Sequence, residues 1–98
     1  MSDTLMPKHL ESTYKMLKHA FPNGIGNDDY FPLMSLLYEY MSDRNLAEVI
    51  SSITGKDIAI TLNDIQKSVS VNLSSDEVIQ NIRKKLLPYG FEEWTEEE

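Results

Sequence analysis

Cysteine is absent from this sequence of 98 residues. Its absence excludes disulfide bonds, thiolate ligands for a metal ion and a cysteine nucleophile. Histidine is scarce too, and the ten positions from His9 to His19 correspond to a rotation of about 280° around one helix, which takes them off a shared face, so they cannot bind a metal ion together as a helical pair. The oxygen-bearing side chains of residues 27–29 lack the spacing of an EF-hand loop. We therefore expect a protein that is not an enzyme and holds no cofactor or metal ion.

Long hydrophobic runs are absent as well. No segment approaches the roughly 20 apolar residues that span a bilayer, and residues 1–10 lack a basic stretch leading into an apolar one. We therefore expect a cytoplasmic protein that does not contact a membrane. Hydrophobic residues make up 41% of the chain and charged residues 26%, which is typical of a globular domain.

The net charge of −7 is concentrated at the C-terminal end. Five glutamates of the segment 92–98 supply most of it, and the remaining chain has nine basic and eleven acidic residues. Such a body does not attract phosphate, so nucleic acid is not the expected partner. We predict one helical domain over residues 1–91 and an acidic, flexible tail over 92–98. Trp94 within that tail could act as a short docking motif or could fold back onto the domain.

Apolar residues recur at helical spacing in five segments, which predicts an all-α, compact single-domain bundle of about five short helices. The second is apolar on nearly all sides and is therefore the expected central element. The predicted helices cover residues 8–20, a second from residues 27–29 to Met41, a third from Ser42 to Gly55, a fourth from Thr61 into 68–71, and a fifth from Ser74 to the stop at Leu87-Pro88 and Gly90.

Three of these helices carry an expected capping side chain at the start. Ser42 precedes the third helix, Thr61 opens a Thr-x-x-Asp variant at the fourth, and Ser74 with Glu77 forms a full capping box at the fifth. The run Ile58-Ala59-Ile60 has no second strand to pair with, so we interpret it as a linker.

The segment between the first two helices predicts a structural turn. Gly24-Ile25-Gly26 lacks the preceding strand and the third glycine of a dinucleotide fingerprint. We expect the glycines to permit positive φ angles and a carboxylate to cap the second helix. Asp28 and Asp29 are the candidates for this cap, and Asp29 is favoured.

The strings Phe21-Pro22-Asn23-Gly24-Ile25 and Asp29-Tyr30-Phe31-Pro32-Leu33, followed by Leu36-Leu37, resemble a family of small bacterial proteins. That family is well populated in actinobacteria and is classed as a domain of unknown function. The likeness covers most of the chain up to Phe91. It implies a domain of about five helices and no known activity, so it assigns no catalytic residue. The acidic tail and the low alanine content depart from the family pattern.

Six aromatic residues are candidates for binding a partner, because so small a domain cannot bury all of its aromatic side chains. They are Tyr30, Phe31, Tyr38, Tyr40, Tyr89 and Trp94. The leading hypothesis is a non-enzymatic helical module that binds an unknown protein partner.

Two other functions stay open at this point. One is a helix-turn-helix-like nucleic-acid-binding protein, built from the third and fourth or the fourth and fifth helices; the chain's acidity argues against it. The other is an enzyme whose site a partner chain completes. The oligomeric state is not predicted.

Overall fold

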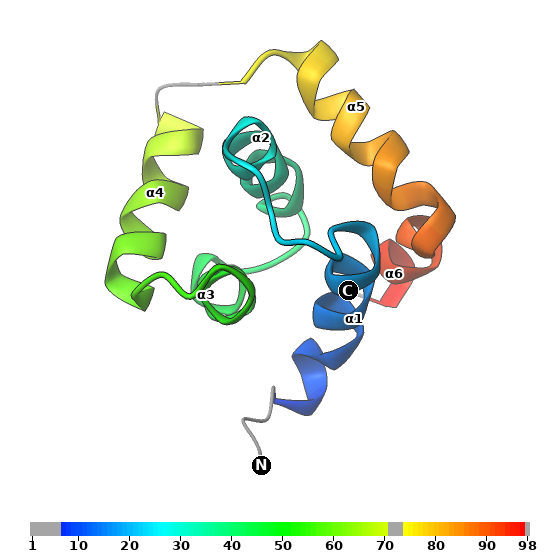
Figure 1. Ribbon diagram of the computed structural model, residues 1–98, viewed down its shortest axis with the longest axis horizontal. Helices are drawn as coiled ribbons and strands as arrows, with labels where there is room; N and C mark the ends of the chain where they lie inside the picture. Colours follow the sequence, from blue (N-terminus) through cyan, green and yellow to red (C-terminus); the bar gives the residue numbers. More distant parts are fainter. Residues whose placement is uncertain (1–6, 71–73, 98) are drawn as a thin grey trace.

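The computed structural model describes residues 7–70 and 74–97, which form six α-helices, two short 3-10 helices and no β-strand (Figure 1). The elements are η1 (Lys8–Leu10), α1 (Glu11–Ala20), α2 (Asn27–Leu37), α3 (Asp43–Thr54), α4 (Ile58–Ser70), α5 (Asp76–Leu86), η2 (Leu87–Tyr89) and α6 (Phe91–Glu97). The predicted all-α fold is confirmed, with one helix more than expected. Residues 1–6, 71–73 and 98 lie outside the described residues. The predictions of the domain, of the end of the fourth helix and of the tail extended over them. In the described part, every helix is too short or too polar to cross a membrane.

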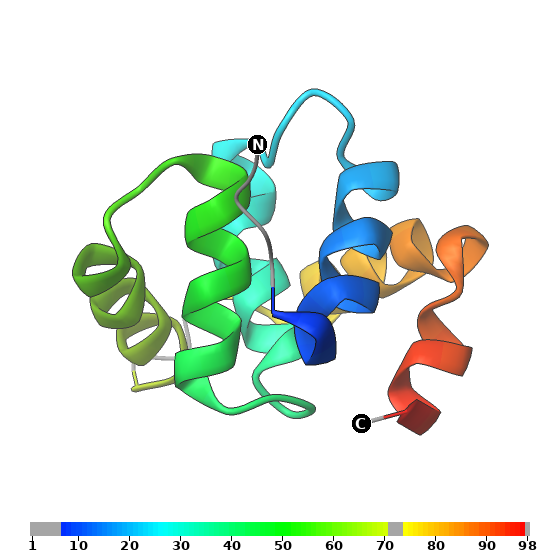
Figure 2. The same cartoon turned by 90° about the horizontal axis from the view of Figure 1, so that it is seen from below.

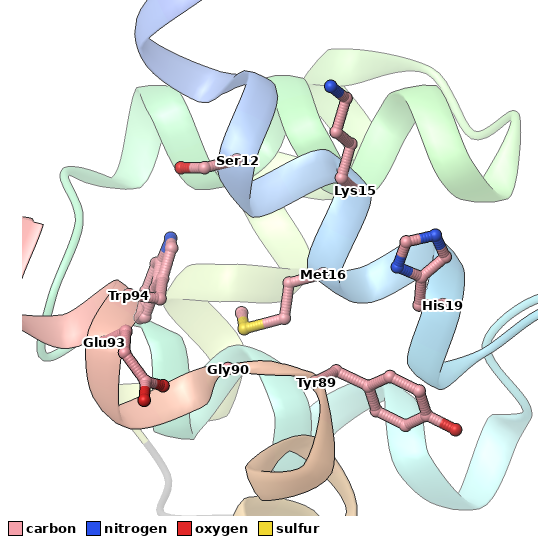
Figure 3. A pocket seen from close by; sticks show the side chains of 8 residues that line it. All are labelled: Ser12, Lys15, Met16, His19, Tyr89, Gly90, Glu93 and Trp94. Carbon is pink, nitrogen blue, oxygen red and sulfur yellow. The ribbon is translucent and has the colours of Figure 1, made fainter.

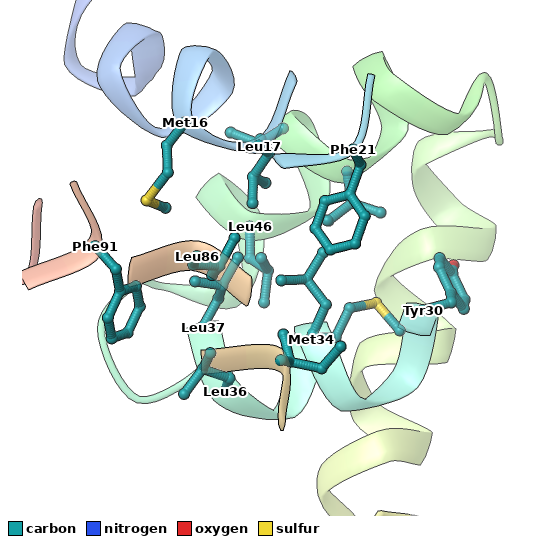
Figure 4. Packing of buried hydrophobic residues seen from close by; sticks show 14 of the residues in the cluster. Met16, Leu17, Phe21, Tyr30, Met34, Leu36, Leu37, Leu46, Leu86 and Phe91 are labelled. Carbon is teal, nitrogen blue, oxygen red and sulfur yellow. The ribbon is translucent and has the colours of Figure 1, made fainter. Parts of the chain in front are cut away.

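Helix α2 occupies the middle of the molecule, as its apolar sequence predicts. It packs against α4 and α5, while α3 packs against α4 and α1 packs against α3 and α5 (Figures 1 and 2). Buried apolar side chains from these helices form one cluster (Figure 4). The cluster members with no exposed surface are Leu17, Leu33, Met34, Leu37, Leu46, Ala47, Val49, Ile50, Ile65 and Leu86. Burial of such side chains is the main stabilising contribution in a protein without disulfides.

Helix α4 begins three residues earlier than the sequence pattern predicts. The Oδ1 atom of Asp57 accepts a hydrogen bond of 2.8 Å from the backbone N–H of Ala59, so Asp57 satisfies a free donor of the first turn. Thr61, the expected cap, lies inside the helix and donates its hydroxyl to the Asp57 carbonyl at 3.0 Å. The linker assignment for residues 58–60 is therefore wrong. The exposed Ile58 and Ile60 belong to the first helical turn.

The start of α2 also differs from the prediction. Gly26 occupies the N-cap position, and no side chain caps the helix. Asp28 and Asp29 lie within the first turn, where their negative charges interact favourably with the positive end of the helix dipole. Neither side chain caps the helix. Asp29 instead accepts a hydrogen bond of 3.2 Å from Lys85 Nζ on α5. Of the two turn glycines, only Gly24 has a positive φ, +95°.

Three further helix ends show how closely the sequence patterns predict the observed caps. Ser42 caps α3 by accepting from the N–H of Asn45 at 3.1 Å, and Gly55 ends that helix in the left-handed conformation, both as predicted. At α5 the cap is Ser75, which accepts from Val78 N at 3.3 Å. The predicted box starting at Ser74 is therefore one position early, because Ser74 is buried before the helix begins.

The prediction of a flexible tail is wrong for the described residues 92–97, because they belong to helix α6. Phe91 and Trp94 lie three positions apart on one face of this helix, and both are buried. They stack with centroids 5.8 Å apart, and Tyr40 meets each ring edge-on. Burial of two large aromatic side chains outweighs the repulsion among the glutamates on the outer face. Of the two interpretations of Trp94, folding back onto the domain is the one observed.

Candidate functional site

The six aromatic residues proposed to bind a partner do not form one surface. Two are buried (Tyr30 and Trp94), two are half-buried (Phe31 and Tyr40), and two are exposed (Tyr38 and Tyr89). The exposed fraction is 46% for Tyr89 and 38% for Tyr38. Of these two exposed side chains, Tyr89 lines a hollow that also contains charged side chains. The expected aromatic surface therefore reduces to the surroundings of Tyr89.

We name this depression the α1–α6 hollow, and its volume is about 250 Å³ (Figure 3). One wall is helix α1, and the opposite wall is the segment from η2 into α6. It is lined by Ser12, Lys15, Met16, His19, Tyr89, Gly90, Glu93 and Trp94. Of this set, only Tyr89 and Trp94 were predicted from the sequence to bind a partner.

Local sequence explains why these side chains meet. Ser12, Met16 and His19 are spaced at i, i+4 and i+7, so they share one face of α1. Gly90 adopts a φ of +87°, which turns the chain sharply between η2 and α6. The turn leaves Tyr89 toward one end of the wall that η2 and α6 form, and Glu93 toward its other end (Figure 3).

The base of the hollow is apolar and its mouth is polar. Met16 and Trp94 are buried, with exposed fractions of 4% and 3%. At the mouth, the rings of His19 and Tyr89 lie 6.4 Å apart between centroids and are tilted by 42°. Lys15 on α1 and Glu93 on α6 are both exposed. The hollow therefore places an apolar surface between side chains of opposite charge.

The polar side chains of the hollow do not form a catalytic constellation. A nucleophile such as Ser12 requires a base within hydrogen-bonding reach. No hydrogen bond joins Ser12, His19 and Glu93 to one another in the described structure. Among residues 7–70 and 74–97, no group of three or more His, Asp or Glu residues is arranged to hold a metal ion.

A second hollow, of about 330 Å³, lies between the turn at residues 23–27 and the end of α3. Tyr30, one of its lining residues, donates a hydrogen bond of 2.7 Å to Asp64 Oδ2, which joins α2 to α4. Lys56 Nζ lies 4.0 Å from the same oxygen and 4.3 Å from the centroid of the Tyr30 ring. Burial, and then the Asp64 carboxylate, raise the pKa of Tyr30 well above its ordinary value. The contacts of Tyr30 are within the fold, so this cluster is structural.

The sequence pattern carried no signal for the Tyr30–Asp64 contact. The two residues are 34 positions apart, and neither belongs to a sequence motif that would predict a contact with the other.

Two of the three adjacent basic residues on α5 form ion pairs within the fold. Arg83 lies 3.5 Å from Glu92, and Lys85 pairs with Asp29.

Helices α3 and α4 have the short connection of a helix-turn-helix, residues 55–57 with Gly55 at its start. The exposed surface of α4 does not suit a recognition helix. Its first turn presents Ile58 and Ile60, and Lys67 is its single basic residue. DNA recognition relies on Lys and Arg contacts to phosphate, and α4 offers one such side chain.

A family model described as "Protein of unknown function (DUF3349)" matches residues 8–94. The match reaches beyond Phe91, where the resemblance in the sequence was expected to end, and it includes Trp94. Both walls of the α1–α6 hollow therefore fall within the matched region. Neither the curated proteins nor the solved structures contain a significant match to this chain.

Proposed function

This chain belongs to the DUF3349 family of proteins of unknown function, and we propose that it is a non-enzymatic interaction module that binds a protein partner through the α1–α6 hollow. The observation that carries the proposal is the position of Tyr89. It is the most exposed of the Phe, Tyr and Trp side chains in the described structure, and it lies beside an apolar base formed by Met16 and Trp94. Tyrosine is enriched at the energetic centres of protein interfaces, because it buries a large ring and keeps a polar tip.

The size of the hollow supports a protein partner. Pockets for small molecules usually enclose about 300–1,000 Å³, and the α1–α6 hollow encloses about 250 Å³. That volume suits one large apolar side chain, with the backbone of its segment lying across Tyr89 and His19. A side chain seated there would exclude water from Met16 and from the ring face of Tyr89.

The composition of the rim supports a binding function over catalysis. Lys15, His19 and Glu93 are all exposed, and water screens charges at such positions. Catalytic groups are normally held in a site that excludes water or beside a close charged partner. The rim charges instead resemble the polar border of an interface, which sets partner choice and association rate.

Affinity capture from the native cell tests this proposal. A tagged chain is compared with Tyr89→Asp and with Tyr38→Asp, and the captured proteins are measured quantitatively by mass spectrometry. Tyr38 is the matched control, since it is the other exposed tyrosine and lies outside the hollow. The expected result is one or more partners lost with Tyr89→Asp and retained with Tyr38→Asp.

If both variants retained the captured partners equally, the assignment of the α1–α6 hollow as the binding site would be contradicted. A small-molecule turnover activity of the purified chain, lost on substituting Ser12 or His19, would contradict the non-enzymatic assignment. Far-UV circular dichroism of both variants verifies that a loss of partner is not a loss of fold.

A further inference from the structure

Building on the proposed function, we infer that the partner segment presents one apolar side chain flanked by an acidic residue on one side and a basic residue on the other. The inference rests on the charges of the two walls of the α1–α6 hollow. Lys15 stands on the α1 wall, and Glu93 stands on the α6 wall.

The α1 wall is basic beyond this one residue. Its last turn adds Lys18 and His19, and its single acidic residue, Glu11, is in the first turn. His19 lines the hollow together with Lys15 (Figure 3). A carboxylate on the partner therefore finds its complement on this side.

The α6 wall carries the opposite charge. Helix α6 contains several glutamates and no basic residue. Glu92 faces Arg83 at 3.5 Å, whereas no ion pair within the described residues involves Glu93 or Lys15. Glu93 lines the hollow and is exposed. A lysine or arginine on the partner therefore faces Glu93.

These charges determine the orientation of the bound segment. In one orientation its acidic residue faces Lys15 and its basic residue faces Glu93; in the reverse orientation, both contacts are between like charges. Exposed ion pairs are individually weak. The apolar base of the hollow therefore supplies most of the affinity, and the charges determine the orientation of the bound segment. The expected preference between the two orientations is about three- to tenfold in Kd.

A displayed library of random short peptides, selected on the purified chain, supplies the probe. The selected peptides are expected to contain an apolar residue between an acidic and a basic residue, and to lose binding to Tyr89→Asp. One selected peptide and its charge-swapped counterpart are then titrated against the wild type and against the double variant Lys15→Glu/Glu93→Lys. We expect the swapped peptide to bind the wild type about three- to tenfold more weakly, and to recover that loss on the double variant.

The control reverses two charges elsewhere without changing the net charge. Glu39 and Lys67 are both exposed and lie outside the hollow, so Glu39→Lys/Lys67→Glu should not exchange the peptide preference. If the reversed double variant does not fold, the neutral variant Lys15→Gln/Glu93→Gln should bind both peptides equally.

The outcomes separate this inference from the proposed function. Peptides that depend on Tyr89 but bind the wild type and the reversed variant equally would overturn the charge assignment and leave the binding site in place. A selection that yields no peptide dependent on Tyr89 would overturn the proposed function, and the inference with it.

Discussion

Trp94 donates a hydrogen bond of 2.7 Å from its indole Nε1 to the hydroxyl Oγ1 of Thr13, across 81 positions of the chain. Both side chains are buried. The bond fixes α6 against α1, and these two helices supply opposite walls of the α1–α6 hollow. The shape of the proposed binding site therefore depends on a contact between the two ends of the described chain.

Replacing Thr13 with valine keeps the side-chain volume and removes the acceptor. The buried indole N–H then has no partner, which costs about 1–3 kcal/mol in the free energy of unfolding. Thr13→Ser keeps the hydroxyl and should lose less. Urea unfolding followed by the fluorescence of Trp94 measures both variants. Equal stabilities for the valine variant and the wild type would show that the bond does not fasten α6.

Substitution of Trp94 tests whether α6 is an integral part of the fold. Trp94→Ala removes a side chain that is buried against Phe91 and Tyr40, and should destabilise the domain by about 3–5 kcal/mol. Trp94→Phe retains much of the packing and should lose less. Thermal unfolding followed by circular dichroism gives the comparison. A flexible tail, by contrast, would leave the midpoint of Trp94→Ala unchanged.

Capping by Asp57 can be separated from the effect of an acidic first turn. Asp57→Ala removes the acceptor for Ala59 N and should cost about 1 kcal/mol. Asp28→Ala removes an exposed carboxylate from the first turn of α2, where no side chain acts as a cap, and should cost no more than about 0.5 kcal/mol. Chemical denaturation of the two variants in parallel gives the measurement. The reverse ranking would restore Asp28 as a capping residue.

Tyr30→Phe removes the hydrogen bond to Asp64 and should cost about 1–3 kcal/mol near neutral pH. Because burial and Asp64 raise the pKa of Tyr30 in the folded state, the unfolded chain loses this proton first as the pH rises. The stabilising contribution of the neutral phenol is therefore complete below about pH 10, the ordinary tyrosine pKa, and declines above it. Urea titrations across this range should show the wild type losing its advantage over Tyr30→Phe. A constant difference up to the alkaline limit of folding would contradict the raised pKa.

Local patterns in the sequence predicted most of the helices because their causes are local. The apolar spacing of α1, α2, α3 and α5, the cap at Ser42 and the stop at Gly55 each depend on residues a few positions apart. The missed features depend on competition between neighbours. Asp57 and Ser75 displaced the expected caps at Thr61 and Ser74, and a shift of one to four residues is beyond what capping preferences resolve.

The candidate site was less predictable than the fold. Tyr89 and Trp94 were proposed from the sequence, but Met16, Lys15 and Glu93 were not, because only the tertiary contact between α1 and α6 brings them together. Trp94 was placed in a tail dominated by glutamates, where net charge favoured disorder. The spacing of Phe91 and Trp94 was the one local sign of a buried helical face.

Nuclear magnetic resonance mapping on the 15N-labelled chain tests the location of the binding site most directly. Trp94 is the only tryptophan, so its indole N–H gives one identifiable resonance. On titration with a captured partner or a selected peptide, we expect this resonance to shift together with the amides of Met16, His19 and Tyr89, while the amides of Ile58 and Ile60 stay in place. Saturable binding that shifts the α4 amides and leaves Trp94 and Tyr89 unchanged would contradict the assignment of the α1–α6 hollow as the binding site.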